Sequence, residues 1–378
     1  HEVGHTLGLR HNFGATSYYT AAQLRDPKFL RDNGHTTSIM DYSRFNFVVQ
    51  PEDNVPRELL FPRISHYDYW AIEWGYRRFY QFADAREEIP YLNGWVIEQT
   101  KDPFLRFNGG AESGLNDPRA QAEDLGDNQM ETCELGIRNL KVILQHLPEW
   151  TITPHENYRG LSTLYPQITT QFNRYIGHVS KWVGGVYADA KTVEQEGPLY
   201  VPVPRAKQKE AMTFLKRHIF TAPQWILPDY LSDLLPTNRL AVMENLQKSA
   251  VTGLIDASVL VRMLRAEEQL GNAAYSTEEF FEDMNSAVFG NYGQTDIYSR
   301  SLQNIYINTL CDLVKPKEDA TANLAPAARR RAVSIENNDV KALVSAQLEQ
   351  TGKKLKRGKG DERTRAHYNY LYKTIDNL

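Results

Sequence analysis

Apolar residues recur every three or four positions along most of the chain beyond residue 115, and this spacing predicts helices. One helix is expected over residues 133–147 and a longer one over residues 161–186, which Pro166 either begins or kinks. Apolar residues at the same spacing predict further helices at residues 255–270, 302–313, 340–348 and 368–375. Residues 95–100 and 199–203 read instead as short strands, the second an edge strand or extended linker because of its prolines.

Three other segments have local signals of their own. Ser65 and Asp68 have the spacing of a capping box, and residues 69–76 after them read as an amphipathic helix. The basic run at residues 353–360 is interrupted by glycines, which predicts a solvated linker between two helices. The acidic stretch at residues 123–127 lacks the ligand spacing of a calcium loop, and we expect it to start a helix.

Composition narrows the class of protein. The chain has 378 residues, with 43 Lys and Arg against 47 Asp and Glu. This balance lacks the basic footprint of a dedicated nucleic-acid binder, so we expect no nucleic-acid partner. No apolar run approaches the roughly 18 to 20 residues that cross a bilayer. The two cysteines, Cys133 and Cys311, cannot form a disulfide framework, and both fall on apolar helix faces as small buried side chains.

Three of the ten histidines stand within the first eleven residues, which read HEVGHTLGLRH. On a helix, His1 and His5 share one face, and Glu2 flanks it without having to act as a ligand. Gly8 can take the left-handed conformation that ends a helix, so that His11 returns as a third ligand. Three imidazoles suit Zn²⁺ and leave a position for water, whose proton Glu2 can take as a general base.

The alternatives to a zinc site are a chance match and a copper chelate. A chance match would need the two histidines, the glutamate, the glycine and the third histidine to coincide, which is improbable in a chain of this length. A free N-terminal His1 could instead chelate copper through its amine and ring. That site would require neither Glu2 nor Gly8 nor the spacing of His1 and His5, all of which are present.

The extended motif resembles that of the metzincin clan of zinc metalloproteases. The clan has a turn with a methionine beneath the zinc histidines, and Ser38-Ile39-Met40-Asp41-Tyr42 is similar to it. The resemblance implies that Met40 has a structural role and that Tyr42 stabilises the oxyanion. Without the resemblance, Met40 would be interpreted as a core residue and Tyr42 as an aromatic residue packed in the turn. The capped helix matches the one that follows this turn in the clan, and residues 43–62 would wall the S1′ pocket.

The whole chain resembles the C-terminal part of a family of large, poorly characterised bacterial metzincins that are exported. The segments HEVGHTLGLRHNFGA, YDYWAIEWGYRRF and DPRAQAEDLGDNQM carry this likeness. It implies that the chain is mainly α and comes from a parent protein of the α+β class. Residues 1–80 would form the C-terminal subdomain of the catalytic domain, residues 81–115 a connecting segment with short strands, and residues 116–378 a helical domain. Asn12 departs from the better-known families, so their substrate rules do not transfer.

We therefore expect a zinc-dependent endopeptidase with His1, His5 and His11 as metal ligands and Glu2 and Tyr42 as catalytic residues. Its partners would be a peptide or protein substrate and the upstream part of the same protein, in an extracytoplasmic location. Because the chain starts at the first ligand, we expect weak zinc binding and little activity from this piece alone. The alternatives are a non-catalytic helical scaffold that retains the motif and a hydrolase of non-peptide amides.

The seven remaining histidines have no partner at ligand spacing and are expected to be surface or core residues. They are His35, His66, His146, His155, His178, His218 and His367.

Overall fold

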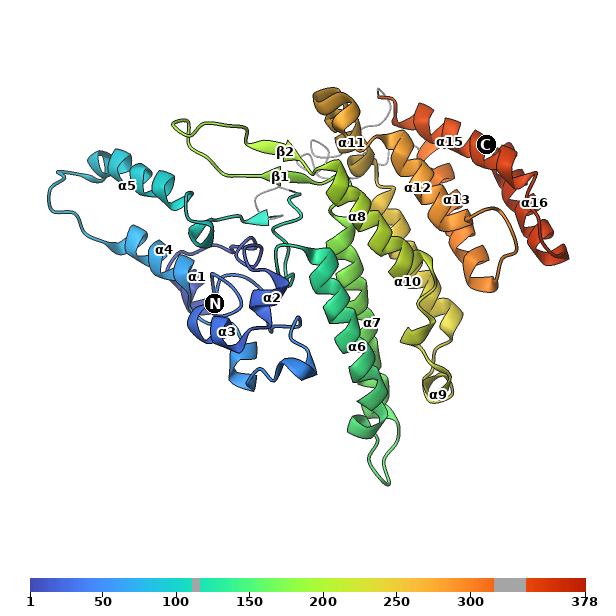
Figure 1. Cartoon of the computed structure of the whole chain (residues 1–378), viewed down its shortest axis with the longest axis horizontal. Coiled ribbons are helices and arrows are strands. Elements are labelled where there is room, and N and C mark those ends of the chain that lie inside the picture. The colour runs from blue at the N-terminus through green and yellow to red at the C-terminus, as the bar shows by residue number, and fades with distance from the viewer. Residues whose placement is uncertain (111–115, 316–337) are drawn as a thin grey trace. The chain divides into compact units, whose positions relative to one another are not determined.

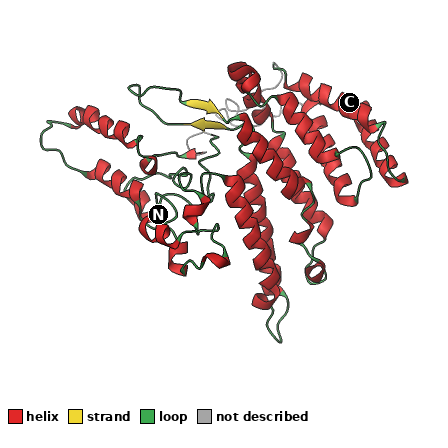
Figure 2. Cartoon of the chain, in the orientation of Figure 1, coloured by secondary structure: helices red, strands yellow, loops and turns green. Residues whose placement is uncertain are grey.

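The computed structural model describes residues 1–110, 116–315 and 338–378. Helices dominate this part of the chain, and its strands are one antiparallel pair, β1 (Val186–Ala188) and β2 (Tyr200–Pro202), with Tyr187 opposite Val201 (Figure 2). The mainly α fold predicted from the sequence is confirmed, and β2 falls within the predicted strand at residues 199–203. No helix among the described residues is long and apolar enough to cross a membrane.

The chain forms two compact units. The first contains residues 1–145 and 185–203, and the second contains residues 146–184 and 204–378. These contact units have boundaries that differ from the three parts outlined from the sequence, and that division stays a prediction.

The first unit consists of short helices joined by long loops. Its elements are α1 (Glu2–Thr6), α2 (Ala21–Leu24), α3 (Pro27–Asn33), the 3-10 turns η1 (Pro51–Asp53), η2 (Arg57–Leu60) and η3 (Pro103–Leu105), α4 (His66–Tyr76), α5 (Ala85–Gln99), β1, β2 and most of α6 (Gln129–Thr151) (Figure 1). The predicted capping box is present at the start of α4, where the Asp68 carboxylate accepts the Ser65 backbone N–H at 3.0 Å. The buried side chains of this unit include Tyr19, Leu24, Leu30 and Met40.

The second unit is a set of packed helices. They are α7 (Arg159–Ser180), α8 (Arg205–Leu215) with the π turn η5 (Lys216–Phe220), η6 (Gln224–Ile226), α9 (Asp229–Ser232), α10 (Arg239–Leu254), α11 (Ala257–Leu270), η7 (Gly271–Ala273), α12 (Thr277–Phe289), α13 (Ile297–Val314), α15 (Val340–Leu355) and α16 (Glu362–Asp376). Helix α10 packs on both α7 and α13, and α15 packs on α13 and α16 (Figure 1). Phe172, Leu254, Tyr306 and Val344 are buried in this unit.

The strand predicted at residues 95–100 is wrong, because residues 85–99 form α5. The Asp84 carboxylate caps this helix by accepting the backbone N–H groups of Arg86 and Glu87. Tyr91 and Trp95 are four residues apart and pack on each other on one helix face. The six residues 95–100 are too few for the spacing of their apolar side chains to distinguish a helix from a strand.

Three other expectations need correction or completion. Residues 123–127 form a loop before α6 rather than its start, with left-handed backbone at Glu123 and Gly126. Helix α7 begins at Arg159, ends at Ser180 and contains Pro166 internally, so Val186 belongs to β1. The basic run at residues 353–360 covers the last turn of α15 and the linker to α16. The predicted linker is therefore present, but the run begins inside the helix.

Candidate metal centre

Helix α1 carries the first two histidines and is ended by Gly8. Gly8 has a φ of 82°, and its N–H donates to the His5 carbonyl at 3.0 Å. The next residue, Leu9, donates its N–H to the Gly4 carbonyl at 3.0 Å. These two bonds form a Schellman motif, in which glycine takes a backbone conformation that a side chain would disfavour. The turn brings the chain back so that His11 faces the helix.

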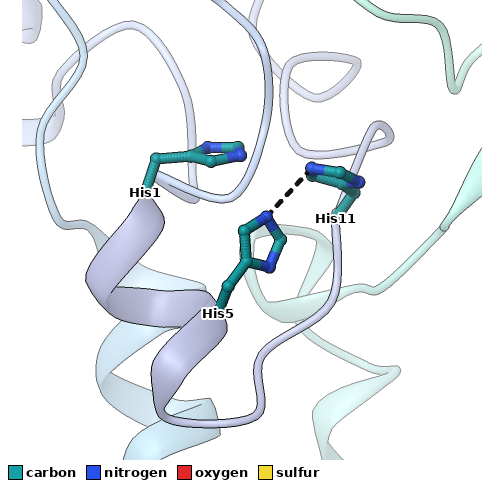
Figure 3. A group of neighbouring side chains, drawn as sticks. All are labelled: His1, His5 and His11. Atoms are coloured by element: carbon teal, nitrogen blue, oxygen red, sulfur yellow. Dashed lines mark hydrogen bonds between the residues drawn. The ribbon is translucent and has the colours of Figure 1, made fainter.

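The structure brings His1, His5 and His11 together (Figure 3). One ring nitrogen from each lies within 4.8 Å of the others, and the Nε2 atoms of His5 and His11 are 3.1 Å apart. Among the described residues, this is the only group of three or more His, Cys, Asp or Glu side chains close enough to hold one ion. The spacing of the motif therefore corresponds to a real cluster in space.

Backbone carbonyls fix the orientation of two of the rings. His1 Nδ1 donates to the Ile39 carbonyl at 2.7 Å, and His5 Nδ1 donates to the Leu9 carbonyl at 2.9 Å. Such bonds select the tautomer whose Nε2 lone pair is available to a metal. The Nε2 of His1 is buried and has no hydrogen-bond partner in the described structure, which fits a nitrogen that serves as a ligand.

This geometry also bears on the copper alternative. A chelate that uses the amine and ring of one histidine employs Nδ1, the ring nitrogen nearer the backbone. In His1 that atom is engaged by Ile39. Three neutral imidazoles that present Nε2 instead suit tetrahedral Zn²⁺ with one position left for water.

Met40 lies directly beneath α1. Its side chain is fully buried, and a Cβ built on Gly4 would collide with its Sδ atom. The absence of a side chain at position 4 lets the thioether lie against the helix backbone between His1 and His5. The turn is tied to the chain after His11, because Asn12 donates its backbone N–H to the Met40 carbonyl at 3.1 Å.

Asp68 of α4 organises the turn from its other side. Its carboxylate accepts the Ser38 hydroxyl at 2.6 Å and the Ile39 backbone N–H at 2.7 Å. Burial raises the pKa of Asp68, while these hydrogen bonds and that of Ser65 oppose the rise. Because the Ile39 carbonyl holds His1, Asp68 supports a candidate ligand through Ile39. Sequence spacing predicts only a capping role for Asp68, since its contact with the turn depends on the tertiary structure.

Of the two candidate catalytic residues, Glu2 follows His1 in the sequence and Tyr42 packs on the histidine rings. Glu2 is the first residue of α1 and has an exposed side chain. The ring of Tyr42 stacks on that of His1, with centroids 4.8 Å apart, and lies 4.7 Å from that of His11. Tyr42 is 36% exposed, so its ring contacts the histidine cluster and also meets solvent. Its neighbour Asp41 points away into the core, where burial and the nearby Asp124 carboxylate hold its pKa well above the ordinary value.

The remaining histidines lie elsewhere, as the sequence predicts. His35, His178 and His218 are buried, and the others are half-buried or exposed. Burial lowers the pKa of His35 to about 4, while its Nε2 donates to the Ser43 carbonyl at 2.9 Å. Both cysteines are buried as expected, and burial raises the pKa of each thiol.

Comparison with known proteins agrees with this geometry. A family model described as Met-zincin matches residues 1–296. No curated protein matches the chain, and no solved structure does. The match covers more than three quarters of the 378 residues and extends well beyond the motif. The chain therefore belongs to the Met-zincin family, whose members are metzincin-type zinc metallopeptidases.

Proposed function

We propose that this protein is a zinc-dependent endopeptidase, with His1, His5 and His11 as the ligands of one Zn²⁺ ion. The observation that carries the proposal is the convergence of three imidazole nitrogens within 4.8 Å, two of them on rings whose opposite nitrogens are held by backbone carbonyls. Zinc bound there would lower the pKa of a water molecule and polarise the scissile carbonyl.

In this proposal Glu2 moves the proton. Its exposed carboxylate, one residue from His1 on the first turn of α1, accepts a proton from the attacking water. It then passes that proton to the amine that leaves when the peptide bond breaks. A carboxylate can carry out both steps because the same oxygen accepts and later donates the proton.

In this proposal Tyr42 stabilises the charge that forms on the substrate. The support is that its ring lies against those of His1 and His11, two of the histidines that would bind the metal beside a substrate carbonyl. A phenol O–H can donate to the oxyanion that forms on that carbonyl. We also propose that residues 43–62, which include η1 and η2, border the pocket for the side chain after the scissile bond.

The test is cleavage of a mixed peptide library by the natural full-length chain that contains these residues, with products identified by mass spectrometry. We expect internal peptide bonds to be cut, and Glu2→Ala to abolish cleavage while zinc stays bound. Retained cleavage in that variant would remove Glu2 from the role of general base. Absence of cleavage in the unmodified protein would favour a scaffold, and cleavage of non-peptide amides alone would favour the other hydrolase class.

We propose an extracytoplasmic location for the protein, in a bacterium. The support is the likeness of the whole chain to a family of exported bacterial metzincins. Fractionation of cells that express the natural chain tests this, and recovery with the cytoplasmic fraction alone would contradict it.

A further inference from the structure

Asn12, the residue after the third histidine, is completely buried and hydrogen-bonded through both ends of its side chain. Its Nδ2 donates to the Arg106 carbonyl at 3.0 Å, and its Oδ1 accepts the Asn108 backbone N–H at 2.9 Å. An amide offers a donor and an acceptor side by side, as one residue of a β-ladder does. The Asn12 side chain therefore pairs with residues 106–108 as a short strand would.

The same pairing continues along the chain. Gly14 donates its backbone N–H to the Asn108 carbonyl at 3.0 Å. Phe13 lies between these two anchored residues, and its ring stacks on that of His11 with centroids 5.1 Å apart and planes 25° apart. Residues 12–14 thus fix the backbone after His11 and provide a surface against which the imidazole lies.

Residues 106–108 are held in turn by a buried carboxylate. Asp117 Oδ2 accepts Asn108 Nδ2 at 3.0 Å and the backbone N–H of Ala188, in β1, at 2.8 Å. Arg119 balances this charge with an ion pair of 2.7 Å to the same oxygen. The chain of contacts therefore runs from His11 through Asn12 and Asn108 to the β1–β2 pair.

We propose that Asn12 is a positioning residue that holds His11 in place for metal binding, with Phe13 orienting its ring. This inference rests on the proposed zinc site, although it does not depend on peptide cleavage. An aspartate at position 12 would keep the shape and the acceptor but would set a carboxylate oxygen against the Arg106 carbonyl. Metal affinity should then fall, because a group that orients a ligand typically contributes about 10- to 100-fold.

The experiment compares Asn12→Asp with Gln303→Glu in the natural full-length chain. Gln303, in α13, is a matched control because it is also buried, donates Nε2 to the Val288 carbonyl at 3.2 Å and accepts His367 Nε2 at 2.9 Å. Zn²⁺ affinity is measured by competition with a chromogenic chelator, and the ligand geometry is followed through the visible spectrum of bound Co²⁺. We expect Asn12→Asp to lose about 10- to 100-fold in Zn²⁺ affinity with a changed spectrum, and Gln303→Glu to bind as the unmodified protein does.

Equal affinities in both variants, or equal losses, would overturn the inference. If Asn12→Asp does not fold, Phe13→Leu takes its place, with an expected several-fold loss and a shifted Co²⁺ spectrum; an unchanged spectrum would contradict the role of Phe13. In a His11→Ala background, Asn12→Asp should cause no further loss, whereas an undiminished loss would show that Asn12 does not act through His11. Because the readout is metal binding, a protein that binds zinc in this way but cuts no peptide would contradict only the proposed function.

Discussion

The Asp68 carboxylate and the His1 imidazole are bound to opposite sides of one residue, Ile39. Asp68 accepts the Ile39 N–H at 2.7 Å, and the Ile39 carbonyl accepts His1 Nδ1 at 2.7 Å. A side chain in α4 therefore orients a candidate metal ligand at the start of α1.

Replacing Asp68 tests this relationship. Asp68→Asn would put an amide N–H against one of the three donors that Asp68 now accepts, leaving a buried donor unpaired at a cost of about 1–3 kcal/mol. Zn²⁺ affinity should fall about tenfold as His1 loses its fixed orientation. Asp32→Asn, an exposed change in α3, is the control and should alter neither the melting temperature nor chelator competition. A normal zinc affinity in Asp68→Asn would show that the turn holds His1 without Asp68.

Gly4 should be intolerant of a side chain. Gly4→Ala would force Met40 from its buried position and should cost about 1–3 kcal/mol of stability, as overpacking does. Gly75 is the matched control, because it also lies in a helix and a Cβ there would meet no atom within 4 Å. Gly75→Ala should stabilise the protein by about 0.5–1 kcal/mol through helix propensity. Denaturant unfolding measures both, and equal effects would contradict the close approach of Met40.

Removing the Tyr42 hydroxyl separates its two possible roles. If the phenol donates to the oxyanion, Tyr42→Phe should lower kcat by about 10²–10³ while zinc content and KM change little. Tyr69→Phe, an exposed change in α4, should leave kcat unaltered. An unchanged kcat in Tyr42→Phe would mean that the ring only packs against His1.

His35 should make the protein less stable in acid. Its pKa is about 4 in the folded state, against an ordinary value of about 6.5 in the unfolded chain, so the unfolded state binds more protons between these values. Stability should therefore rise with pH from about 4 to about 6.5, by up to roughly 3 kcal/mol from this group. In His35→Gln, the free energy of unfolding should depend less on pH between about 4 and about 6.5. Identical pH profiles of unfolding free energy for the two proteins would contradict the assignment.

Sequence spacing predicts that His1, His5 and His11 lie close together, because a four-residue step on a helix and a glycine C-cap are local features. The histidines, Gly8 and the Ser65–Asp68 box all lie within a few residues of their partners. Helices with regular apolar stripes, such as α13, are predictable for the same reason.

The contacts that hold the histidines in place cannot be predicted from local spacing. Asn12 reaches residues 106–108 and Asp68 reaches Ile39, and such long-range contacts leave no periodic trace in one sequence. The sequence does not predict helix α5, because a short run of aromatic and branched residues favours a strand. The packing of Tyr91 on Trp95 becomes visible only once the helix is formed.

The most direct test of the central claim is zinc content by elemental analysis, combined with zinc X-ray absorption, on the natural full-length chain and on His5→Ala. We predict one zinc per chain with nitrogen and oxygen ligands and no sulfur, and its loss in His5→Ala but not in His66→Ala, where the histidine is exposed and outside the cluster. One zinc retained in His5→Ala, or a sulfur ligand, would contradict the assignment of the metal site to His1, His5 and His11.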